Sequence, residues 1–144
     1  MGPYLLDANV LIALAWPAHL SHARAMRWFA RHADQGWATC PMTQTAFVRI
    51  LSNPQFSPHA LTPQNALNLL EANLKHPGHS FWADTIGIAD AMRSLQTPIT
   101  GHRQITDAYL VGLALHRKAK LATLDQKIAG WVKAPKSGVV EVIV

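Results

Sequence analysis

The chain has 144 residues, 49% of them hydrophobic and 15% charged, a balance that fits one folded domain over residues 1–144 and excludes a disordered chain. Its apolar runs fall far short of the ~20 residues of a membrane-spanning helix, and a lone cysteine excludes an internal disulfide framework. A formal net charge of +5 suits a polyanionic partner such as nucleic acid, and we expect a cytoplasmic protein without membrane contact.

Short apolar runs alternate with helical patterns along the chain. In chain order we predict a strand at residues 3–6, helices at 9–15 and 20–33, a strand at 36–40, helices at 43–53 and 62–75, a strand at 79–83, helices at 85–95 and 106–118, and strands at 120–124 and 139–143. Thr43 and Thr62 are expected to cap the helices that follow them. The alternation implies an α/β fold, with a parallel sheet covered by helices on both faces. The apolar N-terminus lacks a basic leader, so we interpret it as part of this fold and not as a signal peptide.

Three of the eight acidic residues stand at positions where such a sheet places functional groups. Asp7 and Asp125 each follow a predicted strand, and Asp107 lies near the N-terminus of a predicted helix. Ligands of open α/β sheets bind beyond the carboxyl ends of the strands, so we expect the three carboxylates to meet in one pocket. Each could also serve as an ordinary helix cap or first-turn acid, but the three together favour a functional site over three separate caps.

Carboxylates at one edge repel each other unless a cation neutralises them. Mg²⁺ prefers oxygen ligands, so the pattern predicts a Mg²⁺ site and hydrolysis of a phosphodiester. Asn9 lies two residues after Asp7, and Thr123 lies two residues before Asp125. Residues two apart in extended chain share a face, so both are expected to support the site.

Four segments, LLDANVLIAL, TQTAFVRILSNP, ITDAYLVGLA and ATLDQKI, resemble the PIN-domain family in their order and spacing, most closely the VapC-type toxins of bacterial toxin–antitoxin pairs. The resemblance implies a three-layer sandwich with a central, mostly parallel sheet of short strands. It also implies a Mg²⁺- or Mn²⁺-dependent endoribonuclease, a homodimer, and a small antitoxin encoded beside the toxin. In the family, the acids at the positions of Asp7, Asp107 and Asp125 bind the metal and carry the catalysis.

One departure concerns Gln44, because many members of the family carry a glutamate at the position where this chain has Gln44. Three carboxylates carry a formal charge of −3, which one divalent cation reduces to −1. We therefore expect one firmly held metal, with a second entering mainly together with the substrate. Gln44 is a candidate for orienting water or metal, and Asp84 or Asp90 is an alternative source of the missing charge.

Four arginines are candidates for contacts with RNA phosphates. Arg24, Arg27 and Arg31 recur at helical spacing, although a solvated charged face is the commoner meaning of such a pattern. Arg103 precedes Asp107 by four residues and is expected to approach the acidic pocket.

Two other functions remain open at this point. A PIN-like module that has lost catalysis would bind RNA or protein. Gln44, an uncharged residue in place of the family's glutamate, favours that alternative. A phosphatase that resembles the haloacid dehalogenases would need a second aspartate two residues after Asp7, where this chain has Asn9.

Overall fold

The computed structural model describes residues 2–133 and 135–144. Five short strands carry the fold: β1 (Tyr4–Leu6), β2 (Trp37–Thr39), β3 (His79–Phe81), β4 (Lys120–Thr123) and β5 (Val140–Val142). Six α-helices connect them: α1 (Ala8–Ala15), α2 (His22–His32), α3 (Pro41–Leu51), α4 (Pro63–Leu74), α5 (Ile88–Arg93) and α6 (Ile105–His116). Four short 3₁₀ turns complete the described elements: η1 (Ala33–Gln35), η2 (His102–Gln104), η3 (Gln126–Trp131) and η4 (Ser137–Val139).

The strands form one sheet in the order β3-β2-β1-β4-β5, and all four pairings are parallel. The chain first builds outward from β1 through β2 to β3, then crosses to the other side of β1 for β4 and β5. The border between β1 and β4 is therefore the point where the direction of winding reverses. Open α/β sheets bind their ligands at such a border, beyond the carboxyl ends of the strands.

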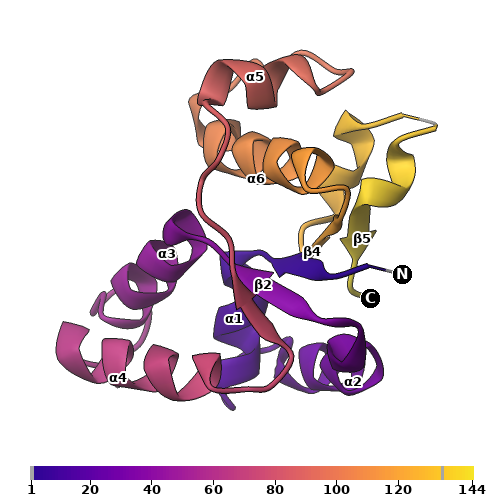
Figure 1. Cartoon of the computed structure of the whole chain (residues 1–144). Coiled ribbons are helices and arrows are strands. Elements are labelled where there is room, and N and C mark those ends of the chain that lie inside the picture. Colours follow the sequence, from indigo (N-terminus) through magenta and orange to yellow (C-terminus); the bar gives the residue numbers. More distant parts are fainter. Residues whose placement is uncertain (1, 134) are drawn as a thin grey trace.

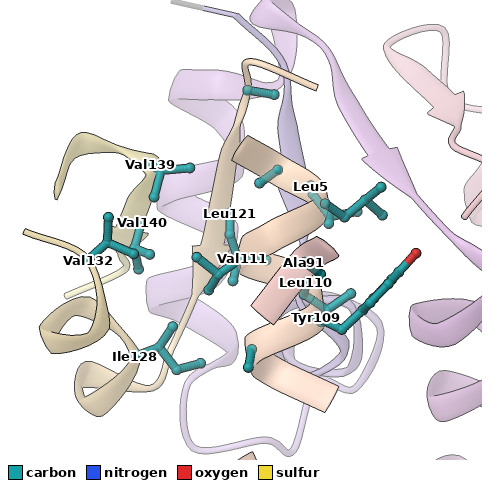
Figure 2. Close-up of a cluster of buried hydrophobic side chains, with 14 of the residues drawn as sticks. Leu5, Ala91, Tyr109, Leu110, Val111, Leu121, Ile128, Val132, Val139 and Val140 are labelled. Carbon is teal, nitrogen blue, oxygen red and sulfur yellow. The ribbon is translucent and has the colours of Figure 1, made fainter. Parts of the chain in front are cut away.

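Helices cover both faces of the sheet, which gives three layers (Figure 1). Alternating side chains of β1 serve the two faces, because successive residues of a strand point in opposite directions. Leu5 packs with α6 and Leu121 in one core cluster, part of which is drawn in Figure 2. Tyr4 and Leu6 pack in the second cluster, which lies against α1 to α4. The predicted three-layer α/β fold is confirmed.

Helix α5 lies against α6 at close range. A Cβ atom added to Gly112 would come within 2.6 Å of the Ala91 Cβ and 2.7 Å of its Cα. Glycine is therefore required at this crossing, which holds α6 in place from the side opposite the sheet. The same helix carries Asp107 in its first turn.

The predicted elements are all present, with shifted ends. The helix expected to begin at Thr43 starts at Pro41, with Cys40 as its N-cap residue. The expectation that Thr43 caps this helix was wrong in its position: the Thr43 hydroxyl accepts a hydrogen bond from the Cys40 amide at 3.0 Å from inside the first turn. Thr62 does cap α4, since its side chain accepts a hydrogen bond from the Asn65 amide. No helix in the described part of the chain has the length and apolar character needed to cross a membrane.

Candidate active site

Asp7 follows β1 directly and is held at the border between β1 and β4. Its backbone amide donates to the Ala122 carbonyl oxygen of the neighbouring strand at 3.0 Å. Its side chain is buried, with 5% exposure, and its contact with α1 is a hydrogen bond from the Ala8 amide rather than a regular N-cap bond. Burying an ionised carboxylate costs free energy, so its place here indicates a role other than starting α1.

The Thr123 hydroxyl is the centre of a polar network around Asp7. It donates to the Asp7 Oδ2 at 2.8 Å, and it accepts from the Asn9 Nδ2 at 3.4 Å and from the Asp125 backbone amide at 3.1 Å. The Asn9 Oδ1 in turn accepts from the Leu124 amide at 3.3 Å. The structure thus brings together the two supporting residues predicted from sequence, Asn9 and Thr123, with Asp7. This network fixes the Asp7 carboxylate and ties the end of β4 to the start of α1.

The three aspartates influence each other electrostatically. Burial raises the pKa of Asp7, against the hydrogen bonds from Thr123 and the Ala8 amide, and the charge of Asp125 raises it further. Burial also raises the pKa of Asp107 to about 6, with smaller contributions from the charges of Asp7 and Asp125. The shifts show that the three carboxylates, far apart in sequence, lie near enough to repel each other.

A cleft of about 280 Å³ opens at this edge of the sheet, and both Asp7 and Asp107 line it. Asn9 also lines the cleft, together with Thr106 and Leu110 of α6. Helix α3 closes the cleft with one face, made of Met42, Thr43, Ala46, Arg49 and Ile50. Asp125 is not among the lining residues, and its Oδ1 accepts a hydrogen bond from the Lys127 amide at 2.9 Å. Asp125 therefore caps η3 while its charge acts on the other two acids.

The donor set fits a hard divalent cation in its chemistry. It consists of carboxylate oxygens that repel each other, and a bound cation would favour their ionised forms. Within the described residues, however, no group of three acidic, histidine or cysteine side chains is already arranged to hold a metal ion.

Gln44 does not lie in the cleft. Its Nε2 donates to the Thr39 Oγ1 at 2.9 Å, and the same oxygen is 2.8 Å from the His79 Nε2. The Gln44 side chain is thus directed towards β2 and β3, and its role in orienting water or metal stays a prediction. The α3 residues that line the cleft include Ala46 and Arg49 but no acid.

The other candidates also lie outside the cleft. Asp90 is exposed on α5 and pairs with Arg93, and Asp84 is exposed in the loop after β3; neither lines the cleft. Arg103 is exposed on η2 and does not line the cleft, contrary to the expectation that it approaches it. The remaining arginine candidates lie on α2, at Arg24, Arg27 and Arg31.

Sequence reasoning missed Arg49 as a residue of this site. Its signal was present in the helical periodicity, because Met42, Ala46, Arg49 and Ile50 stand at the spacing of a single helix face. Knowing which face of α3 turns to the acids requires the packing of α3 against α1, which the sequence does not give.

Comparison with known proteins places this geometry in a family. Residues 4–130 match the model of the PIN domain. Ribonuclease VapC39 of Mycobacterium tuberculosis is 40% identical over 139 residues, which cover 96% of this chain and 98% of that protein. Ribonuclease VapC38 of the same organism is 45% identical over 121 residues, 84% of each chain.

A solved structure is similar in fold. VapBC2 from Rickettsia felis, bound to a DNA fragment from its promoter, superposes with a TM-score of 0.67 and covers 97% of this chain and 98% of that one. Because the sequences are only 14% identical, this similarity shows that the fold is shared and nothing more. The family match spans the acids that meet at the border of β1 and β4, and the chain belongs to the PIN-domain family.

Proposed function

We propose that this chain is a metal-dependent endoribonuclease and the toxin of a toxin–antitoxin pair. The observation that carries the proposal is the meeting of Asp7 and Asp107 in one cleft, under the electrostatic influence of Asp125. The relatives at 38–45% identity that carry the name ribonuclease VapC support the reaction and the substrate class.

The proposed mechanism assigns a role to each acid. Asp7, Asp107 and Asp125 would hold Mg²⁺ or Mn²⁺, which when bound lowers the pKa of a water molecule and neutralises charge on the phosphate. Thr123 and Asn9 hold Asp7 in one orientation through the hydrogen bonds described above. Asp107, with a pKa of about 6 without metal, is the acid whose ionisation a cation would favour most visibly.

The substrate class is tested with a labelled single-stranded RNA and the DNA of the same sequence. We expect cleavage of the RNA with Mg²⁺ or Mn²⁺, none with chelator, and much slower cleavage of the DNA. Equal cleavage of both nucleic acids would contradict an RNA-specific enzyme, and cleavage that persists in chelator would contradict metal dependence.

A second function is favoured by one observation. In the described part of the chain the acids are not pre-arranged around a metal, and α3 brings no acidic side chain to the cleft. A catalytically weak module that binds RNA or protein would share these features. RNA binding that is unchanged by chelator, together with no cleavage in Mg²⁺ or Mn²⁺, would favour this alternative.

The proposed antitoxin requires a surface, and an apolar groove of about 480 Å³ is suited to it. The groove lies between α1, α2 and α4 and is lined by Leu11, Leu14, Met26, Phe29, Trp37, Ala72, Asn73, Lys75 and His76. A helix with an apolar face and acidic flanks would complement the apolar lining and Lys75. Co-expression of the protein encoded beside the gene with wild type and with Met26→Asp tests this, because the substitution should abolish co-purification.

The expected homodimer remains part of the proposal. Light scattering on the purified protein distinguishes a dimer from a monomer directly, and a monomer at all concentrations would contradict it.

A further inference from the structure

We propose that Arg49 binds a phosphate of the RNA backbone next to the bond that is cut. This inference rests on the proposed nuclease function and adds the residue that would hold the substrate in register. Among the described residues that line the acidic cleft, Arg49 is the one with a cationic side chain. Arginine recognises phosphate through a planar set of donors that a carbonyl or hydroxyl group does not match.

The surroundings of Arg49 leave its guanidinium available. The residue is exposed, and within the described chain its side chain makes no ion pair and no hydrogen bond. An arginine beside acids commonly pairs with one of them, and here it does not. Its position at the cleft without a protein partner is the feature that points to a ligand anion.

A second hollow extends the cleft past Arg49. It has about 290 Å³ and shares Met42, Ala46, Arg49 and Thr106 with the acidic cleft. Thr45 and Pro41 line the part that lies beyond the shared residues. Arg49 therefore stands where the two hollows join. A nucleic-acid strand that places one phosphate at the acids would pass its neighbouring phosphate along this path.

The net charge of the acidic site explains why a cationic side chain is needed beside it. The three aspartates with one divalent cation keep a formal charge of −1, which would repel an incoming phosphodiester. Arg49 brings the site to neutrality before the substrate arrives. No acidic residue of α3 lines the cleft, so no carboxylate on this helix face competes with the phosphate for Arg49.

The inference is tested with Arg49→Gln, and with Arg93→Gln as the matched control. Arg93 is an exposed helix arginine that lines neither hollow, and its exposed ion pair with Asp90 contributes little stability. Binding of a fluorescent single-stranded RNA is measured by anisotropy in the Asp7→Asn background, which we expect not to cleave. We expect Arg49→Gln to weaken binding about tenfold, as for one lost charge-assisted hydrogen bond. It should also reduce the slope of log affinity against log salt by about 0.7, as for one lost phosphate contact on a single strand.

The same substitutions are then compared in the active chain. Arg49→Gln should raise KM more than it lowers kcat, Arg49→Lys should recover part of the loss, and Arg93→Gln should behave as wild type. Unchanged affinity and salt slope in Arg49→Gln, with a cleaving wild type, would overturn the role of Arg49 and leave the nuclease intact. A wild type that neither cleaves nor binds RNA would overturn both proposals.

Discussion

The residue with the most consequences is Thr123, which is fully buried and whose hydroxyl contacts two of the three aspartates through different atoms. It holds the Asp7 carboxylate with one hydrogen bond and the backbone of Asp125 with another. Residues behind the ligands of a metal often set its affinity by orienting those ligands. A chain with all three acids but without this hydroxyl would therefore be a poorer metal binder.

Thr123→Val is expected to lower stability by about 2 kcal/mol, because it leaves a buried carboxylate without its hydrogen-bond donor. It should also weaken Mn²⁺ binding between about 10-fold and 100-fold. Urea unfolding and calorimetry measure the two effects. Thr123→Ser keeps the hydroxyl and should retain most of the metal affinity, and equal affinities in both variants would contradict the assigned role.

The raised pKa of Asp107 leads us to expect that the folding stability of the metal-free protein falls as pH rises. The pKa of this carboxyl is about 6 in the folded chain and 3.8 ordinarily, so the folded state binds more protons between these values. Stability must then fall as pH rises through the window from about 4 to 6, and the penalty is complete above it. Asp107→Asn removes the penalty, which partial exposure limits to about 1 kcal/mol.

The measurement is thermal unfolding in chelator at pH 7. Asp107→Asn should raise Tm by roughly 3 °C, while Asp34→Asn, at an exposed acid, should not. With metal present the order should reverse, because the variant has lost a ligand. A variant less stable than wild type in chelator would contradict the repulsion inferred at the cleft.

At the scale of elements, helix α3 decides what faces the acids. Its buried side chains Phe47 and Leu51 pack against α1 and α4, and this contact fixes its rotation. Rotation then presents Ala46 and Arg49 to the cleft and turns Gln44 towards Thr39. A charged side chain at position 46 or 49 of α3 therefore acts on the cleft, whereas one at position 44 acts on β2 and β3.

This rotation is tested by placing one glutamate at either position. Ala46→Glu adds a carboxylate to the cleft and should create a second metal site in Mn²⁺ calorimetry, whereas Gln44→Glu should leave the stoichiometry at one. A second site in Gln44→Glu, or none in Ala46→Glu, would show that α3 is rotated differently.

The close packing of α5 against α6, the helix that carries Asp107, is tested at Gly112. Gly112→Ala forces its new Cβ against Ala91 and should cost about 1–3 kcal/mol, as overpacked cores do. The free energy of unfolding in urea measures it. Gly130→Ala is the control, since nothing lies within 4 Å of a Cβ there. Equal stability in the two variants would contradict the close approach of the helices.

At the scale of the whole molecule, most of the fold was predictable from sequence because each element carries a local signal. The apolar runs at Tyr4–Leu6 and Lys120–Thr123 predict buried strands, and the sequence Thr62-Pro63 predicts a helix start. The parallel sheet follows from their alternation with helices. Asp7 and Asp107 were also predictable neighbours, since a parallel sheet brings the carboxyl ends of its strands and the N-termini of its helices to one edge.

The rotation of helices about their axes was not predictable in the same way. Gln44 and Arg49 both lie on α3, and only the contacts of α3 with its neighbours decide which one reaches the acids. Arg103 is close to Asp107 in sequence, yet the 3₁₀ turn η2 leaves it exposed outside the cleft. For Arg103, closeness to Asp107 in sequence therefore did not predict closeness in space.

The proposed activity depends on one arrangement, in which acids from opposite ends of the chain act together on a metal and an RNA phosphodiester. The measurement that tests it most directly is cleavage of purified total RNA in Mn²⁺ by wild type, Asp7→Asn, Asp107→Asn and the exposed control Asp34→Asn. We expect discrete fragments from wild type and Asp34→Asn, and none from the two cleft variants or from wild type in chelator. Cleavage by a folded Asp7→Asn at the wild-type rate would contradict the account.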